Sequence, residues 1–480
     1  MIQHLKYAYF IGIGGIGMSA IARYFQSIGI AVSGYDKTPT SLTDSLIKEG
    51  IQVHFDDDIN SITSDLIQGN KNEVLIVITP AIPANHSEYN YFKAQQFTIK
   101  KRAEVLGMIT QSTFNAAVAG THGKTTTSCM LTHILKYSGY DVTAFLGGIS
   151  KNYNTNFIAG NQINSGVINH LSDQESAHTL APVVVEADEY DRSFLTLHPD
   201  IAIVTSVDSD HLDIYGNANS LKESFGLFTA QVKSKGSLIT KAGLSYQPIC
   251  NNDVQIYHYA VNQLADFSAT EIKIIDGTYT FKLNSCIENI DHIELGLPGL
   301  HNVENSVAAI AAAQIMGVSA SHIQQSLASF TGVNRRFDIR IKTSNFVYID
   351  DYAHHPEEIK AFVNSVKQLF PNKRITGIFQ PHLFSRTRDF AAGFSQSLSL
   401  LDEAILMDIY PARELPISGV SSEMLMKDID CNKKQLLNAS EILDYLKLHQ
   451  PEVLVTIGAG DIDKLVEPIE NLFTHAKNNQ

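Results

Sequence analysis

Apolar runs of the length of buried strands recur along this chain, and segments with apolar residues at helical spacing lie between them. Near the start such runs occupy residues 7–13, 30–33 and 74–79, and residues 18–28 have helical spacing. Strands that alternate with helices in this way are typical of a parallel sheet covered by helices. The first hundred residues therefore predict a Rossmann-like α/β domain.

The same alternation starts again twice. A second series begins with the strand 116–119 and continues with the strands 182–185 and 201–207 and the helix 303–316. A third series begins after Thr331, and its strands are residues 346–349, 375–379, 404–407 and 453–457. We therefore expect an α/β protein of three domains, covering residues 1–110, 111–330 and 331–480.

One stretch interrupts the second series. Residues 151–181 are rich in Asn, Ser and Gly and are too long for a routine connection, so they predict a functional loop or a surface insertion.

Length and composition agree with several packed domains. The chain has 480 residues, of which 44% are hydrophobic and 18% charged, as in globular proteins. Its net charge of -14 excludes a bulk cationic surface for nucleic acid or anionic lipid. The 4 Cys form no CxxC pair, so neither a disulfide framework nor a zinc site is expected, which fits a reducing cytoplasm.

The N-terminus has features of an export signal. Lys6 precedes an apolar stretch that ends in Ala20-Ile21-Ala22, which is similar to a cleavage site. The glycines within this stretch favour a different interpretation, given next, and no apolar run reaches the ~18 residues of a membrane span. We therefore expect neither export nor a membrane segment.

The first glycine-rich motif follows the first strand and opens the first helix. It consists of Gly12, Gly14, Gly15 and Gly17. Such a turn lets backbone N–H groups approach a diphosphate at the helix N-terminus, and Asp36 ends the next strand, where a ribose hydroxyl is usually bound. The motif fits NAD(P), FAD or a UDP-sugar, and also a turn needed only for packing the helix on the sheet.

The second motif is more specific. Residues 120–127 read GTHGKTTT between a short apolar strand and a helix that reaches about Tyr137. Amides of such a loop cradle phosphates, with Lys124 placed for the β- and γ-phosphates and Thr125 for Mg²⁺. Val118 replaces the first glycine of the usual pattern, so this is a compact variant. The alternative is a chance Gly-Lys-Thr turn. The central domain is thus predicted to hold nucleotide phosphates in a P-loop.

Acidic residues at strand ends are candidates for holding the metal. Glu186 ends a buried strand and is the first choice. Asp188, Glu189 and Asp191 fit helix-start or surface acids better. His211 follows another strand among acids, which favours a metal role over a structural one.

Further polar groups cluster later in the chain. Asn302 and Asn305 fit either helix caps or readers of an adenine edge. The pair Arg335-Arg336 suits phosphate, or is a solvated charge pair. Strand ends of the third domain carry His354, Arg386 and Arg388, which would form a pocket for an anion such as a carboxylate, or tie loops together.

Together these motifs resemble those of the Mur ligases, the ATP-dependent amino-acid ligases of peptidoglycan synthesis. The resemblance spans nearly the whole chain. It rests on GIGGIGMS at 12–19, GTHGKTTT at 120–127, VVEADEYDRSF at 184–194, DSDHLDIY at 208–215, GLHNVENSVAA at 299–309, RRF at 335–337, DDYAHHPEEI at 350–359 and FQPHLFSRTRDF at 379–390. The family has a UDP-sugar domain, a central ATPase domain and a C-terminal Rossmann-like domain for the amino acid, which matches the division above.

The resemblance implies a role for each motif. The UDP part of UDP-N-acetylmuramate would contact Gly12, Gly14, Gly15, Gly17 and Asp36. ATP would contact Gly120, Thr121, His122, Gly123, Lys124, Thr125, Thr126, Asn302, Asn305, Arg336 and Asp351. Mg²⁺, or Mn²⁺ in its place, would be held by Thr125, Glu186 and His211. The amino acid would lie near Tyr352, His354 and Arg386, and the catalytic set would be Lys124, Glu186, His211 and Arg336.

Within the family the motifs are most similar to the branch that adds L-alanine. Other branches carry a carbamylated lysine past the metal histidine, where this chain has Phe225-Gly226-Leu227. One departure is Leu383, because many alanine-adding members have Arg there. This implies a bacterial cytoplasmic enzyme, a monomer or weak homodimer, whose substrates are UDP-N-acetylmuramate, L-alanine and ATP, and which binds neither nucleic acid nor membrane.

Three rival interpretations remain at this point. A recycling member of the family would attach a whole peptide to the same sugar, although the continuation at residues 196–199 is more similar to the alanine-adding branch. An NAD-dependent oxidoreductase explains only the first glycine motif. A P-loop kinase or GTPase explains only the second. The preference among Ala, Ser and Gly is also open.

Overall fold

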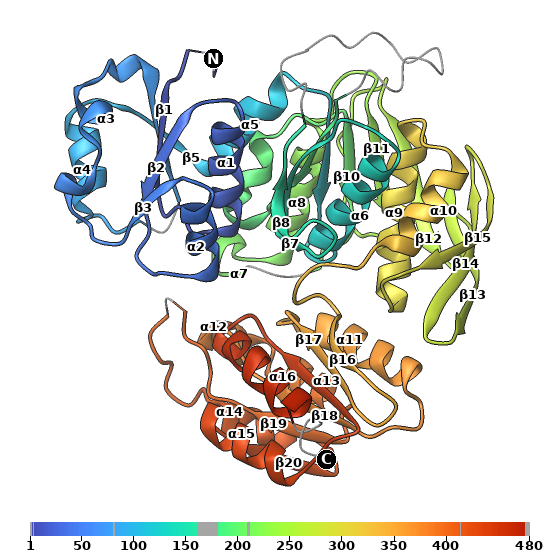
Figure 1. Ribbon diagram of the computed structural model, residues 1–480. Helices are drawn as coiled ribbons and strands as arrows, with labels where there is room; N and C mark the ends of the chain where they lie inside the picture. The colour runs from blue at the N-terminus through green and yellow to red at the C-terminus, as the bar shows by residue number, and fades with distance from the viewer. Residues whose placement is uncertain are drawn as a thin grey trace. The chain divides into compact units, whose positions relative to one another are not determined.

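The computed structural model describes residues 2, 4–79, 82–160, 181–208, 212–412 and 414–475. Within these residues the chain forms three β-sheets, of five, ten and six strands. It divides into two compact units (Figure 1). The first unit comprises residues 1–272, 281–294 and 304–330, and the second comprises residues 273–280, 295–303 and 331–480. The α/β class is confirmed, whereas the domain boundaries near 110 and 330 stay a prediction.

The N-terminal sheet has the strand order β3-β2-β1-β4-β5, with every neighbouring pair parallel. Its strands are β1 (Tyr7–Ile11), β2 (Ala31–Tyr35), β3 (Gln52–His54), β4 (Val74–Ile78) and β5 (Thr98–Lys101). The helices are α1 (Ile16–Ser27), α2 (Ser41–Lys48), α3 (Ser64–Gln68), α4 (Ser87–Ala94) and α5 (Arg102–Gln111). The predicted order of strand, glycine turn, helix and strand is therefore confirmed.

Strand β1 is buried on both faces because its side chains alternate between two apolar clusters. Ala8 and Phe10 pack with residues of α1 and α5, whereas Tyr9 and Ile11 pack with residues of α3 and α4. Figure 1 shows α1 and α4 on opposite sides of this sheet. A strand that is buried on both faces has a continuous run of apolar residues, and this run is why the strand could be predicted from the sequence.

The central sheet has the order β15-β14-β13-β12-β11-β10-β6-β9-β7-β8. Its strands are β6 (Asn115–Ala119), β7 (Thr143–Ser150), β8 (Thr155–Ile158), β9 (Val183–Glu186), β10 (Ile201–Val204), β11 (Ser237–Lys241), β12 (Gln255–Val261), β13 (Phe267–Ile275), β14 (Thr278–Ser285) and β15 (Ile290–Leu295). The helices are α6 (Lys124–Tyr137), α7 (Leu212–Tyr215), α8 (Ala218–Thr229), α9 (Leu300–Ile315) and α10 (Ala320–Ser329).

Two sequence predictions for this sheet were inaccurate. Strand β10 ends at Val204 instead of residue 207: Thr205 still bonds Ala119 at the end of β6, and Ser206 Oγ then accepts the N–H of His122 in the loop after β6. Strand β8 lies inside the stretch that was predicted to be a loop or insertion, of which residues 161–180 lie outside the described residues. Strands β12 to β15 were not predicted; β13 is exposed over much of its second half and lacks a continuous apolar run.

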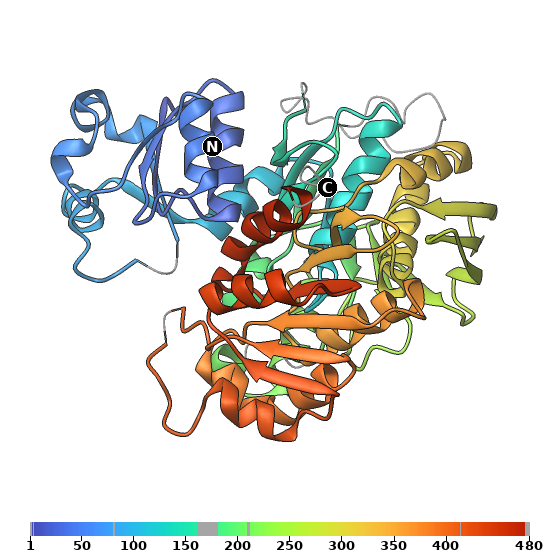
Figure 2. The same cartoon turned by 60° about the horizontal axis from the view of Figure 1, so that its bottom comes forward.

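The C-terminal sheet has the order β16-β17-β21-β18-β19-β20. Its strands are β16 (Asp338–Lys342), β17 (Val347–Asp351), β18 (Ile375–Phe379), β19 (Glu403–Leu406), β20 (Lys433–Leu436) and β21 (Val453–Ile457). The helices are α11 (Pro356–Leu369), α12 (Phe384–Asp389), α13 (Ala391–Leu398), α14 (Ser422–Asp428), α15 (Ala439–Leu448) and α16 (Val466–His475). Only β16 runs antiparallel to its neighbour, and Figure 2 shows these strands side by side in orange and red.

None of the helices in the described part of the chain combines the length and the apolar character that crossing a membrane requires.

Candidate active site

The loop at residues 120–123 joins the buried central strand β6 to α6. Gly120 has φ 139° and Gly123 has φ 81°, and both angles favour glycine. A Cβ on Gly120 would collide with Thr205 Oγ1 and lie 2.9 Å from the backbone N of Ser206. The loop therefore has this shape because its glycines allow the neighbouring chain to approach closely.

Residues after β10 hold the loop in place. The N–H of His122 donates to Ser206 Oγ at 2.7 Å, and Thr121 Oγ1 lies 2.9 Å from the same oxygen. The N–H of Asp208 donates to Thr121 Oγ1 at 3.1 Å. The loop is thus tied to the residues that follow β10.

Lys124 is the first residue of α6, and its side chain turns back over the loop. Its Nζ donates to the carbonyl oxygen of Gly120 at 2.6 Å and lies 2.8 Å from Glu189 Oε2. Burial opposes the charge, but Glu189, Glu186 and Asp188 outweigh it and raise the pKa of Lys124. The loop therefore contains a fixed positive charge whose present partner is a carboxylate.

Thr125 and Glu186 converge beside this lysine. The Thr125 hydroxyl donates to Glu186 Oε1 at 3.1 Å, and Glu186 Oε2 accepts the N–H of Gly147 at 3.0 Å. A hydroxyl beside a carboxylate is an oxygen donor set that suits Mg²⁺. The third predicted metal ligand, His211, lies outside the described residues.

Glu189 does lie at a helix start, directly before the 3-10 helix Tyr190–Thr196, but the interpretation of it as a surface acid was wrong. Its side chain is 1% exposed, since it is buried against Lys124. Asp188 is 37% exposed and bonds Arg102, the first residue of α5, at 2.9 Å. Sequence reasoning missed Arg102; the basic run at residues 100–102 before an apolar helix was the available signal.

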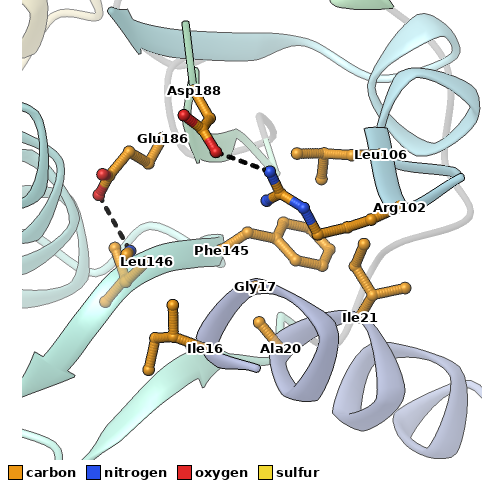
Figure 3. Close-up of a pocket in the computed structure, with 11 residues that line it drawn as sticks. Ile16, Gly17, Ala20, Ile21, Arg102, Leu106, Phe145, Leu146, Glu186 and Asp188 are labelled. Carbon is orange, nitrogen blue, oxygen red and sulfur yellow. Dashed lines mark hydrogen bonds and ion pairs between the residues drawn. The ribbon is translucent and has the colours of Figure 1, made fainter. Parts of the chain in front are cut away.

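A pocket of about 150 Å³ lies between α1, α5 and β7 (Figure 3). Gly17 lies on one side and Glu186 on the other, and Arg102 reaches across toward Asp188. The remaining lining is largely apolar: Ile16, Ala20, Ile21, Leu106, Phe145 and Leu146. The pocket thus connects the first glycine turn with Glu186, which lies beside the loop at residues 120–123.

The turn at residues 12–17 is held by the end of β2: the N–H groups of Gly12 and Ile13 donate to the carbonyl oxygen of Tyr35 at 2.7 and 3.0 Å. The N–H of Gly14 donates to Asp36 Oδ2 at 2.7 Å, so Asp36 supports the turn. A Cβ on Gly12 would lie 2.6 Å from Thr79 Cγ2, and one on Gly14 would lie 2.8 Å from Asp36 Oδ2. Gly15 lies at the N-cap of α1, as expected for a turn that presents amides at a helix start.

The two asparagines of the HNVEN motif are not helix caps. Helix α9 begins at Leu300, so Asn302 and Asn305 lie within it, and both are buried. Asn302 Nδ2 donates to the carbonyl oxygen of Pro298 at 2.6 Å. Asn305 lies so close to Gly123 that a Cβ there would be 2.5 Å from its Oδ1. Asn305 is therefore part of the loop's surroundings.

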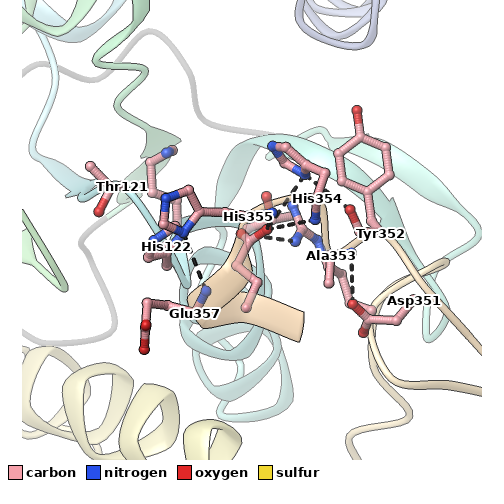
Figure 4. Close-up of polar contacts among 12 residues, drawn as sticks. Thr121, His122, Asp351, Tyr352, Ala353, His354, His355 and Glu357 are labelled. Carbon is pink, nitrogen blue, oxygen red and sulfur yellow. Dashed lines mark hydrogen bonds and ion pairs between the residues drawn. The ribbon is translucent and has the colours of Figure 1, made fainter. Parts of the chain in front are cut away.

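In the second unit, Asp351 ends β17 and is buried. It accepts the N–H groups of Phe337 at 2.7 Å and Ala353 at 2.8 Å (Figure 4). Burial raises the pKa of Asp351 to about 7, although Arg336 and these two N–H groups oppose the rise. The guanidinium carbon of Arg336 lies 4.9 Å from the ring centre of Tyr352. The unit thus brings Arg336, Asp351 and Tyr352 together.

His354 and Arg386 occupy the same edge of this sheet. The ring of His354 lies 5.3 Å from that of Tyr352 and 6.2 Å from that of His382. Arg386 is buried on α12, which starts after Leu383. Leu383 has φ 72°, a conformation rare for a branched side chain, and its N–H donates to the carbonyl oxygen of Tyr410 at 2.9 Å.

A separate polar cluster lies on the other face of the N-terminal sheet. Among the described residues, Asp57, His86 and Glu88 are the one group of three whose ligand atoms converge as in a metal site. Glu88 is buried and accepts a hydrogen bond from Tyr9 Oη at 2.7 Å, and burial raises the pKa of its carboxyl to about 7. Asp57 accepts the N–H groups of Ser87 and Glu88, which anchors the start of α4.

Comparison with known families matches all three parts of the chain. The profile of the Mur ligase family catalytic domain matches residues 7–113, that of the Mur ligase middle domain matches 118–313, and that of the Mur ligase glutamate ligase domain matches 335–460.

Similar proteins cover the chain from end to end. A UDP-N-acetylmuramate–L-alanine ligase of Flavobacterium johnsoniae is 48% identical over 98% of this chain and 99% of its own. The enzyme of the same name from Flavobacterium psychrophilum is 49% identical over 98% of both. The structure of a UDP-N-acetylmuramate–alanine ligase from Thermotoga maritima has a TM-score of 0.80, at 25% identity, over 99% of this chain and 100% of that one.

The fold and the comparisons define an α/β ligase of three domains. The chain belongs to the Mur ligase family. This family is ATP-dependent, and a MurF ligase from Thermotoga maritima was solved in complex with ADP; its fold matches this chain with a TM-score of 0.59 at 15% identity, over 85% of this chain and 97% of that one. The oxidoreductase and the kinase or GTPase interpretations are thereby set aside.

Proposed function

We propose that this chain ligates L-alanine to the carboxylate of UDP-N-acetylmuramate, with conversion of ATP to ADP and phosphate. The relatives of that name cover the whole chain. The observation that carries the proposal is the pocket that runs from the first glycine turn to Glu186, because it links a site for a nucleotide diphosphate to a site for a transferable phosphoryl group. The reaction belongs to peptidoglycan precursor synthesis in the bacterial cytoplasm.

The sugar nucleotide binds at the N-terminal turn. The turn leads into the first turn of α1, which follows its N-cap Gly15, and a diphosphate is favoured there by the N–H groups of a helix start and by the helix dipole. Gly12, Gly17 and Asp36 keep the turn in this shape, since the first two leave room for Thr79 and Arg102 and the third accepts a turn amide. The muramoyl part then extends into the pocket toward Glu186.

ATP binds at residues 120–126. The ammonium group of Lys124 then leaves Glu189 and pairs with the phosphates. An oxygen of the muramate carboxylate attacks the γ-phosphorus, the bond from that phosphorus to the β–γ bridging oxygen breaks, and ADP leaves. The product is an acyl phosphate. Lys124 stabilises the charge on the transferring group electrostatically, and the pre-formed loop holds it in position. Asn302, Asn305, Arg336 and Asp351 contact the nucleotide.

Thr125, Glu186 and His211 hold Mg²⁺, for which Mn²⁺ can substitute. The hydroxyl of Thr125 and the carboxylate of Glu186 already converge at 3.1 Å, which fits a hard cation. The ion supplies positive charge that offsets the charge of the phosphates.

In the second step the amine of L-alanine attacks the acyl carbon. The bond from that carbon to the phosphate oxygen breaks, phosphate leaves, and the amine nitrogen loses its proton to form the amide. Tyr352, His354 and Arg386 bind the amino acid, with the Arg386 guanidinium suited to its carboxylate.

The test is a reaction of the purified chain with UDP-N-acetylmuramate, ATP and Mg²⁺ and with Ala, Ser, Gly or a peptide. We expect stoichiometric phosphate and a product whose mass equals sugar nucleotide plus alanine minus water. With ¹⁸O in the muramate carboxylate, one ¹⁸O should appear in the phosphate, as an acyl phosphate requires. Phosphate release without either acceptor, or a product only with the peptide, would contradict the proposal.

A further inference from the structure

Arg102 places a positive charge in the pocket beside the first glycine turn. Its Nη2 lies 2.9 Å from Asp188 Oδ2, and its side chain is 22% exposed (Figure 3). A Cβ on Gly17 would lie 2.5 Å from Nη1, so the guanidinium packs against the first turn of α1. The absent side chain of Gly17 therefore makes room for an arginine.

The surroundings of Arg102 favour a bound anion. The start of a helix carries partial positive charge, and the first turn of α1 contains no acidic residue to offset it. Arg102 adds a full positive charge to the same region. Both groups attract an anion, and in the structure Asp188 is the carboxylate that meets this guanidinium.

The pair between Arg102 and Asp188 is suited to exchange. Asp188 is 37% exposed, and ion pairs near water contribute little to stability. Breaking the Arg102–Asp188 pair therefore costs little free energy when a ligand anion takes the place of Asp188. The next residue, Glu189, holds Lys124 in the same way at the phosphate-binding loop. Two consecutive acids after β9 thus neutralise one cation at each of the two predicted substrate sites.

We propose that Arg102 binds an anionic group of the sugar nucleotide, and that Asp188 is the counter-ion which this group displaces. The anion is a diphosphate or a carboxylate, since the guanidinium matches both and the pocket lies between the turn and Glu186. This inference rests on the proposed function and names a residue that positions the acceptor substrate.

The test compares the two partners of the pair by calorimetric titration of the full chain with UDP-N-acetylmuramate. Arg102→Gln should weaken binding roughly 10–100-fold, because a charge-assisted bond is lost. Asp188→Asn should tighten binding roughly two- to fivefold, because a competing carboxylate is removed. Opposite signs are the expected result, and Arg102→Lys should restore part of the affinity.

A purely structural ion pair predicts something different. Both variants would then lower the melting temperature and weaken binding together, and this result would overturn the proposal, as would unchanged binding by Arg102→Gln. Lys100→Gln is the matched control for general charge, since Lys100 lies two residues away and pairs with Glu104 at 3.2 Å. Its affinity should equal that of the unaltered chain.

Two further ligands identify the anion. UDP-N-acetylglucosamine and UDP contain the diphosphate but no lactyl carboxylate. An Arg102→Gln loss that is equal for all three ligands assigns Arg102 to the diphosphate, and a loss confined to UDP-N-acetylmuramate assigns it to the carboxylate. If the unaltered chain does not bind UDP-N-acetylmuramate, the proposed function itself is wrong. If the unaltered chain binds it but Arg102→Gln and Asp188→Asn both weaken binding, only the role of Arg102 is wrong.

Discussion

The two glycine turns of the first unit have the same local plan but differ in what surrounds them. Each follows a buried parallel strand and opens a helix. The turn at 12–17 is approached by the side chains of Thr79, Asp36 and Arg102. The loop at 120–123 is approached by Asn305 and by the chain at 205–206, and it is followed directly by Lys124.

We infer that this difference separates binding from transfer. Under the proposed function, a turn that only binds a diphosphate relies on amides and on a cation supplied by another helix, Arg102 of α5. A loop that also stabilises the phosphoryl group during its transfer needs a cation fixed within the loop itself. The predictions below test this contrast, in order of decreasing effect.

Removing the built-in cation should abolish transfer and leave sugar binding intact. Lys124→Ala is expected to lower the ligation rate at least about 1000-fold, since the charge nearest the phosphates is lost. Affinity for UDP-N-acetylmuramate, measured by calorimetry, should change less than about twofold. Lys136→Ala on the exposed end of α6 is the control. Comparable ligation by both variants would break the contrast.

The carboxylate beside the loop should matter for the metal. Glu186→Gln keeps one oxygen for the Thr125 hydroxyl but loses the charge, so the rate should fall roughly 100-fold and more Mg²⁺ should be needed for half-maximal rate. Initial rates over a Mg²⁺ series measure both effects. An unchanged Mg²⁺ dependence would remove Glu186 from the metal site.

Alanine should be tolerated differently by the two turns. Gly120→Ala would bring a Cβ against Thr205 and the backbone of Ser206 in a strained conformation, at a cost of about 2–4 kcal/mol of unfolding free energy. Gly17→Ala meets only the long Arg102 side chain, which can shift more readily than backbone, so less than about 1 kcal/mol is expected. Denaturant unfolding of the two variants gives the comparison, and equal losses would contradict it.

The polar cluster of Asp57, His86 and Glu88 should affect the stability of the chain but not its affinity for UDP-N-acetylmuramate. The pKa of Glu88 is raised to about 7, so the native state retains a proton that the unfolded chain releases near pH 4.5, and stability falls as pH rises between these values. Glu88→Gln should remove this loss, so its stability relative to the unaltered chain should improve by about 2–3 kcal/mol from pH 4.5 to pH 7.5.

Unfolding midpoints of both chains at several pH values measure this difference. Because the nearby histidines are present in both chains, the difference reports the titration of Glu88. Since Tyr9 and Glu88 lie on the sheet face opposite α1, affinity for UDP-N-acetylmuramate should stay constant. A change in that affinity would show that the cluster communicates with the first turn.

Sequence reasoning worked best where a residue's role depends on its neighbours in the chain. Lys124 and Thr125 follow a strand and a glycine loop, so their place at the start of α6 could be predicted, as could Pro356 at the start of α11. It failed for Glu189 and Arg102, which are ordinary acids and bases in the sequence. Their partners are distant along the chain, so the basic run at residues 100–102 and the acids after β9 do not by themselves show which charges meet.

The amino-acid sequence by itself determined the alternation of strands and helices, the two glycine turns and the family, because these depend on short-range patterns of apolar side chains and of backbone freedom. The tertiary structure alone decided which charges meet: Lys124 with Glu189, Arg102 with Asp188, Thr125 with Glu186. Electrostatic interactions and hydrogen bonds depend on distance in space, and only the packing of α5 and α6 beside β9 and the residues that follow it brings these pairs to 2.8–3.1 Å.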